Sequence, residues 1–291
     1  MSILTHSTFL SIPENTLTQW TDITGQLKAG VRYFDIRPVI SSSKFFQGHY
    51  SKIGSNWIGG DGQDLASMIE QVNTFLSTYN ELVILDLSHM HNTDEDWRNL
   101  NPEEFARLLT QLEDLQHRYS GPTGPDSDLA GLPLHTFIAN SPCVLVIISD
   151  SPLVLPSSPP SGIFPSTALN IYNSYTNTPI APLMAADQIN KMLTRRTSRD
   201  SGMFLLSWTL TTPLDIRELA KEAHSILFQP GDTGLWSTIY RNRQKGAYPN
   251  IIMVDGLGST HSRDALLGGK VLTGFCIAVN SVVLEGLGCL A

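Results

Sequence analysis

The sequence predicts an α/β fold, a single irregular TIM-type (β/α)8 barrel domain that spans residues 1–291. About eight strand candidates follow one another along the chain, and most of them are separated by helices. Hydrophobic residues make up 41% of the chain and charged residues only 16%, which indicates a large core with few solvated charges. No internal repeat and no linker-like stretch divides the sequence, so we expect one domain.

The N-terminal part predicts a strand, a helix and a second strand. Residues 2–5 are a short apolar strand candidate that ends at His6. Apolar residues at helical spacing predict a helix over residues 17–28, with Gly30 as its left-handed cap. A β-branched and aromatic run then predicts a strand over residues 31–36.

The segment after this strand predicts an irregular connection. Another strand candidate, residues 44–47, leads into His49. The link from Arg37 is too short for the dozen or so residues of a parallel crossover. The glycine-rich residues 58–64 are expected to form a loop that enters a helix over residues 65–75, because they lack the Gly-Lys-Ser/Thr ending of a phosphate-binding loop.

The rest of the chain alternates strands and helices. Nearly continuous apolar runs predict buried strands, over residues 81–89, 143–149, 203–208 and 250–254. Helical spacing predicts helices, over residues 102–119, 185–194, 214–227 and 233–241. A weaker strand candidate covers residues 169–172, and the proline- and serine-rich residues 152–165 are expected to form a lid or a crossing loop.

Polar side chains recur where the predicted strands end. Catalytic groups of such barrels lie at the carboxyl ends of the strands. These ends carry His6, Arg37, His49, His89, Asp150, Tyr175, Trp208 and Asp255. Asp35 and Arg37 lie two residues apart on one strand face and form either a structural ion pair or part of an active site. Because the other polar residues lie at the same rim, we favour the active site. Asp150 is expected to cap a helix or a loop.

Charge and cysteine usage exclude several function classes. The net charge is −8 and no Lys/Arg stripe extends beyond Arg195 and Arg196, which opposes nucleic-acid binding. The three cysteines lack metal-site spacing and are expected to be buried thiols in a reducing compartment. His89 and His91 lack a third ligand at suitable spacing, so we expect no metal and no cofactor. Without a run long enough to span a membrane or a signal-peptide pattern, we expect a cytoplasmic protein without stable membrane insertion.

Several segments together resemble one enzyme superfamily. They are residues 4–7, 26–37, 48–51, 81–89, 205–210 and 250–255. On these segments the chain resembles the phosphatidylinositol-specific phospholipase C superfamily of X-domain type, and above all the fungal phospholipase C-like phosphodiesterases. The resemblance extends from His6 to about Asn280 and implies a metal-independent enzyme of barrel fold.

The resemblance also implies roles for five residues. His6 resembles the general base that takes a proton from an attacking hydroxyl group, and His49 the general acid that protonates the leaving group. Arg37 resembles the arginine that stabilises the charge on phosphorus in the metal-independent bacterial enzymes. Asp35 and Asp255 resemble carboxylates that orient or charge-balance these groups. The chemistry agrees, because two imidazoles can divide two proton transfers near neutral pH.

The sequence departs from the superfamily in the substrate site. Ser7 stands where Asp or Asn is usual, and positions that offer Lys, Arg and Asp to inositol fall near Ser88 or His89, Ile148 and Asn173. We therefore expect a small-molecule or lipid-like substrate other than ordinary phosphatidylinositol. The candidate substrate-binding residues are Ser7, His89, Tyr175 and Trp208.

Three functions are consistent with this pattern. The first is a metal-independent phosphodiesterase or phosphorus–oxygen lyase. The second is a lyase, dehydratase or cyclase that uses the same acid–base residues on a small non-phosphorylated metabolite of fungal secondary metabolism. The third is a catalytically silent binding barrel. The oligomeric state is not predicted.

Overall fold

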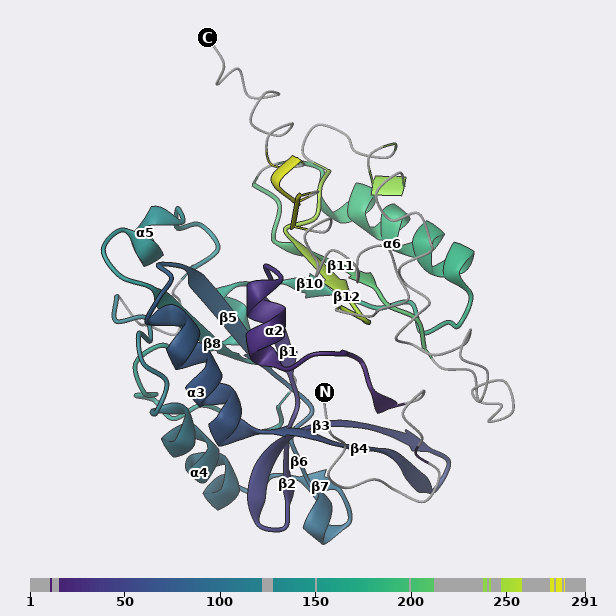
Figure 1. Cartoon of the computed structure of the whole chain (residues 1–291). Coiled ribbons are helices and arrows are strands. Elements are labelled where there is room, and N and C mark those ends of the chain that lie inside the picture. Colours follow the sequence, from purple (N-terminus) through teal and green to yellow (C-terminus); the bar gives the residue numbers. More distant parts are fainter. Residues whose placement is uncertain are drawn as a thin grey trace.

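The computed structural model describes residues 11, 16–121, 128–149, 151–198, 200–211 and 247–257, together with 238, 239, 241, 273, 274, 276–278 and 280. The predicted strand at residues 2–5, the helix at residues 214–227 and most of the helix at residues 233–241 lie outside these residues. So do His6, Ser7 and Asp150. Within the described part, strands and helices form three sheets with flanking helices (Figure 1).

The first sheet contains four parallel strands in the order β1-β5-β8-β9. Their bounds are Tyr33–Ile36, Leu82–Leu87, Cys143–Ile148 and Ile163–Pro165. β5 alternates between fully buried and partly exposed residues, and β8 is buried throughout. The register places Asp35 of β1 opposite Asp86 of β5. Two carboxylates thus lie side by side on neighbouring strands.

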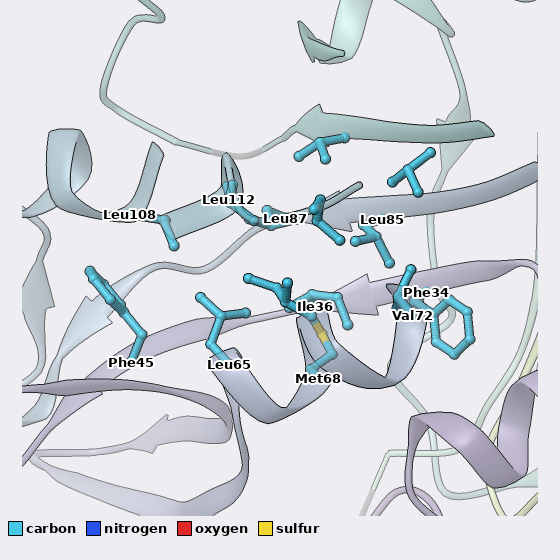
Figure 2. Packing of buried hydrophobic residues seen from close by; sticks show 14 of the residues in the cluster. Phe34, Ile36, Phe45, Leu65, Met68, Val72, Leu85, Leu87, Leu108 and Leu112 are labelled. Carbon is cyan, nitrogen blue, oxygen red and sulfur yellow. The ribbon is translucent and has the colours of Figure 1, made fainter. Parts of the chain in front are cut away.

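Two helices cover the outer face of this sheet, α3 (Leu65–Leu76) and α4 (Pro102–Leu112). α4 begins with a capping box in which Asn101 and Glu104 exchange side chain–backbone hydrogen bonds. Figure 2 shows how α3, α4 and the strands contribute to one apolar cluster, through Phe34, Ile36, Phe45, Leu65, Met68, Val72, Leu85, Leu87, Leu108 and Leu112. This core fixes β1, which contains Asp35 and precedes Arg37, and β5, which precedes His89.

The second parallel sheet has the order β10-β11-β12, with bounds Tyr172–Asn173, Phe204–Trp208 and Ile251–Val254. Helix α6 (Ala181–Arg195) packs on β11 and buries Met184 and Met192 in a separate apolar cluster. The prediction of parallel strands alternating with helices is confirmed for these elements. α6 begins at Ala181, before the predicted start at residue 185, because Pro182 lies in its first turn.

A mixed sheet explains the irregular connection after Arg37. Its order is β4-β3-β2-β6-β7, with bounds Asn56–Asp64, Lys44–Ile53, Pro38–Ser41, His91–Asn92 and Arg98–Asn99. β2, β3 and β4 are antiparallel, so the short link is a hairpin. Ser42 and Ser43 turn with φ of 49° and 63°, and the Asp94 carboxylate accepts both of their backbone N–H groups at 2.8 Å.

The glycine-rich residues 58–64 form most of β4, so the prediction of a loop there is wrong. Glycine is rare in strands because it offers no side chain to pack, but here it allows close contact. Gly59 has φ of +150°, and a Cβ atom at this position would lie 2.0 Å from the His49 carbonyl oxygen. The missing side chain lets β4 pair tightly beside His49.

The predicted helix at residues 17–28 is shorter in the structure. α2 covers Ile23–Lys28, because the Asp22 side chain caps it by accepting the Gly25 N–H. The preceding residues instead join β12: Gln19 Nε2 donates to Val254 O at 2.8 Å, and Gly256 N donates to Thr18 O at 2.8 Å. These bonds bring the end of β12 next to the N-terminal segment.

The continuous described stretches also contain two 3₁₀ turns and one helical turn, η1 (Thr93–Glu95), η2 (Ser166–Ala168) and α5 (His135–Ile138). The segment predicted as a lid or crossing loop contains β9, which pairs with β8.

Candidate active site

A cavity of about 2000 Å³ lies between the strands, and its lining includes residues at their carboxyl ends, such as Arg37, Ser88 and Asp255. It is lined by four of the five predicted catalytic residues and by two of the predicted substrate-binding residues, namely Asp35, Arg37, His49, Asp255, His89 and Tyr175. The predicted His6 and Ser7 lie outside the described residues. The structure thus brings together residues from strands far apart in the sequence.

Asp35 and Arg37 form an ion pair that faces this cavity. Arg37 Nη2 lies 3.2 Å from Asp35 Oδ2, and 31% and 26% of the two side chains are exposed, respectively. A pair this accessible contributes only about 0–1 kcal/mol to stability. The backbone of Arg37 is fixed because its carbonyl accepts the Gly48 N–H of β3 at 2.8 Å. The guanidinium group is therefore held in place and can still receive an anion.

His49 lies on β3 and is oriented by the N-terminal segment. Its Nδ1 is 2.9 Å from the Thr16 carbonyl oxygen. Since a carbonyl oxygen only accepts hydrogen bonds, Nδ1 carries the proton and Nε2 is the acceptor in the neutral ring. Desolvation and then the charge of Arg37 lower the pKa of His49 to about 4, against the opposing influence of Thr16 and Asp35. Without a ligand His49 is therefore neutral at pH 7.

Asp255 follows β12 and lines the same cavity. Desolvation raises its pKa to about 7; Arg37 opposes this rise and Asp35 adds to it. Unlike an ordinary carboxyl group, Asp255 exchanges a proton near neutral pH, which makes it a candidate for proton transfer or for balancing the charge of its neighbours.

Ser88 and His89 follow β5 and connect to the ion pair. Ser88 Oγ donates to Asp35 Oδ1 at 3.2 Å, and His89 Nδ1 lies 2.9 Å from Ser88 Oγ. His89 has φ of 50°, a left-handed conformation that is uncommon for residues other than glycine. A turn directly after β5 thus places His89 at the cavity.

Asp86 is a cavity residue that the sequence interpretation missed. The Tyr33 hydroxyl donates a hydrogen bond to Asp86 Oδ2. Burial raises the pKa of Asp86, and the charge of Asp35 raises it further. The hydrogen bonds from Tyr33 and Ser149 act in the opposite direction and lower this pKa. Burial also raises the pKa of Tyr33. A carboxylate inside an otherwise apolar run was the available signal, since a charge there needs a partner or a proton.

The structure corrects the expectation that Trp208 forms a pocket wall. The side chain is fully buried and packs in the apolar cluster that contains Met184 and Met192 of α6. Because side chains alternate along a strand, Trp208 and the following Thr209 face opposite ways, and Thr209 lines the cavity instead. Tyr175 is 60% exposed and lines the cavity, and its role in substrate binding stays a prediction.

The described residues contain no group of three or more His, Cys, Asp or Glu side chains that could hold a metal ion. In the same part of the chain, no helix is long and apolar enough to cross a membrane. Fixed positive charge next to His49 comes from Arg37.

Comparisons with known proteins find similarity in structure. No protein-family profile and no curated protein matches the sequence. The phosphatidylinositol-specific phospholipase C of Listeria monocytogenes superimposes with a TM-score of 0.53 at 18% identity, covering 84% of this chain and 80% of that chain. A variant of the Staphylococcus aureus phosphatidylinositol-specific phospholipase C gives 0.58 at 14% identity, covering 89% and 86%. The predicted fold class is therefore confirmed: the chain has a mixed α/β fold that matches the TIM-like barrels of these bacterial phospholipases.

Proposed function

We propose that the protein is a metal-independent phosphodiesterase, or phosphorus–oxygen lyase, of the phospholipase C type. The observation that carries the proposal is the cluster of Arg37, His49 and Asp255 at one cavity, on a fold that matches bacterial phospholipases. A fixed cation can stabilise the charge that develops in phosphoryl transfer, and an imidazole and a carboxyl group with a pKa near 7 can move the protons.

In this proposal Arg37 binds the phosphodiester and changes the state of His49. Desolvation and, after it, the guanidinium charge lower the pKa of His49 in the ligand-free site. A bound phosphate brings a negative charge that offsets the guanidinium, so the pKa of His49 rises when substrate binds. Ligand binding thus lets His49 take up a proton from solvent, and this is the proton that a general acid must donate.

The proposed reaction moves two protons and exchanges one phosphorus–oxygen bond for another. A substrate hydroxyl loses its proton to a general base, the role that His6 holds by resemblance. The hydroxyl oxygen then attacks phosphorus, and Arg37 stabilises the added negative charge. The bond from phosphorus to the leaving group breaks, and the departing oxygen takes the proton from His49. The product is a cyclic phosphate.

The substrate is proposed to be small or lipid-like and other than ordinary phosphatidylinositol. In the bacterial enzymes that this chain resembles, Lys, Arg and Asp contact inositol, whereas the corresponding positions here fall near Ser88 or His89, Ile148 and Asn173. Tyr175, which is largely exposed at the cavity, offers an aromatic face instead. The part of the substrate that contacts these positions is therefore proposed to differ from inositol.

A panel of phosphodiesters tests the proposal. We expect turnover that persists in EDTA, that is lost in His6→Ala and His49→Ala, and that is retained in His135→Ala, a control on α5 outside the cavity. The absence of His-dependent turnover for every phosphodiester would refute the proposal. Binding of a ligand without phosphate in the same cavity would instead favour a dehydratase or cyclase.

A further inference from the structure

A short segment, residues 16–19, lies against the end of β12. In the part of the chain that the structure describes, β12 pairs with β11 on one side, and no strand ladder joins its other edge to β1. Gly256 has φ of 74°, so the chain turns directly after the strand. The Gly256 N–H of this turn donates to the Thr18 carbonyl oxygen at 2.8 Å. The segment thus provides contacts that a neighbouring strand provides in a closed sheet.

Gln19 holds this turn on both sides of Asp255. Its Nε2 donates to the carbonyl oxygen of Val254, the residue before Asp255, at 2.8 Å. Its Oε1 accepts the N–H of Leu257, two residues after Asp255, at 2.9 Å. Both polar atoms of one side chain are therefore bonded to the backbone that carries Asp255.

The same segment orients His49. The Thr16 carbonyl oxygen lies 2.9 Å from His49 Nδ1, and Thr16 is 2% exposed. Thr16 and Gln19 are three residues apart, and an extended chain advances at most about 3.6 Å per residue, so their Cα atoms lie within about 11 Å of each other. β3 and β12 belong to different sheets. Segment 16–19 is thus a short connection between the strand of His49 and the turn of Asp255.

Resting on the phosphodiesterase function proposed above, we infer that Gln19 is a positioning residue, which holds the turn at Asp255 against the segment that orients His49. Gln19 acts through the backbone on either side of Asp255 and transfers no proton itself. Asp255 and His49 are both influenced by the charges of Arg37 and Asp35. A fixed distance between the two proton-exchanging groups and this ion pair is what Gln19 maintains.

Carbon-13 NMR of the Asp255 carboxyl carbon tests the inference in the ligand-free full-length protein, with Asp255→Asn to assign the signal. Gln19→Met keeps the length of the side chain and removes both hydrogen bonds. Desolvation is the largest cause of the raised pKa of Asp255, and Arg37 and Asp35 stay in place in the variant. Release of the turn admits water, so this pKa should fall from about 7 by about 1 pH unit or more.

Asn73→Leu is the matched control for a structural role. Asn73 also uses both atoms of its amide on distant backbone groups: Nδ2 donates to Asp114 O at 2.9 Å, and Oδ1 accepts the Gln116 N–H at 2.7 Å. It lies outside the cavity. Both variants should lower stability in urea denaturation, and only Gln19→Met should shift the pKa of Asp255. An equal shift in both variants would overturn the inference.

Gln19→Asn keeps the amide but shortens the side chain by one methylene group, so it cannot reach both Val254 and Leu257. It should shift the pKa of Asp255 in the same direction as Gln19→Met and by less, and it replaces Gln19→Met in the test if that variant does not fold. An Asp255 that titrates at its wild-type pH in the folded Gln19 variants would overturn the inference.

Steady-state kinetics test the catalytic consequence. On a phosphodiester that the wild type turns over, Gln19→Met should lower kcat about tenfold or more, because it misplaces Asp255. KM should stay within about twofold, since Gln19 is not proposed to bind substrate. Asn73→Leu should match the wild type in both constants. An unchanged kcat in Gln19→Met would overturn the positioning role. No turnover of any phosphodiester by the wild type would refute the proposed function instead, and the NMR titration would still decide whether Gln19 positions Asp255.

Discussion

The strongest quantitative prediction concerns the effect of Arg37 on the pKa of His49. In the structure this pKa falls from 6.5 to about 4, with desolvation as the largest cause and the charge of Arg37 as the second. A full charge close to a titrating group shifts its pKa by about 1 pH unit or more, so we assign about 1 pH unit to Arg37. Arg37→Met keeps the bulk of the side chain and removes the charge. The pKa of His49 should therefore rise by about 1 pH unit, equivalent to about 1.4 kcal/mol.

The assay is an NMR titration of the His49 ring in the full-length protein, with His49→Gln to assign its signal. Arg107→Met is the matched control, because Arg107 is an exposed arginine that contacts the Ser43 carbonyl oxygen and lies outside the cavity. This control should leave the pKa unchanged. Inorganic phosphate should raise the pKa in the wild type and have no effect in Arg37→Met. A pKa that stays at its wild-type value or falls in Arg37→Met would refute the electrostatic argument.

Three further predictions follow from the site and its strands. His49→Ala should lower kcat by about 10²–10⁴-fold on a phosphodiester with an alkyl leaving group. The loss should be far smaller on a 4-nitrophenyl ester, because its leaving group needs no protonation. Equal losses of kcat on the two substrates in steady-state kinetics would argue that His49 is not a general acid. The folded-state pKa of Asp255 is raised to about 7, so its contribution to stability is present at acid pH and is lost as the pH rises through 7. In urea denaturation, Asp255→Asn should therefore stabilise the protein at pH 8 and leave its stability unchanged at pH 4. Stabilisation at pH 4 but not at pH 8 would contradict the raised pKa. Gly59→Ala should lower the free energy of unfolding by about 2 kcal/mol or more, because the new Cβ would meet the His49 carbonyl oxygen. Gly54→Ala, also at positive φ but in open space, should lower it by about 1 kcal/mol. Equal costs in denaturant titrations would show that the clash at Gly59 is relieved.

The location of several candidate residues at one cavity could be predicted because they lie at strand ends. Asp35 lies on β1 and Arg37 follows its last residue, and their spacing of two residues places them on one face. His49 and Asp255 follow from the resemblance, and the structure brings both to the cavity. The hydrogen bond from Ser88 to Asp35 and the hydrogen bond between His89 and Ser88 could not be predicted, since they depend on how the turn after β5 is folded.

The errors in the predicted fold have local physical causes. The glycine-rich β4 looks like a loop because its stability comes from pairing with β3, and no local propensity reports that pairing. Trp208 was assigned to the rim because the side-chain alternation of a buried strand cannot be phased from an apolar run. The hairpin between β2 and β3 resolves the short link after Arg37, which the sequence showed to be irregular without giving its form. The single-domain organisation and the cytoplasmic location stay predictions.

The central claim is that Arg37 and His49 belong to a site for phosphoryl transfer. Phosphorus-31 NMR of a phosphodiester reaction tests this claim most directly. With a substrate that carries a hydroxyl group beside phosphorus, the wild type should produce a cyclic phosphate signal in the presence of EDTA. Arg37→Met and His49→Ala should produce none in the same time, and Arg107→Met should match the wild type. A wild type that leaves every phosphodiester signal unchanged, or an Arg37→Met variant as active as the wild type, would contradict the account.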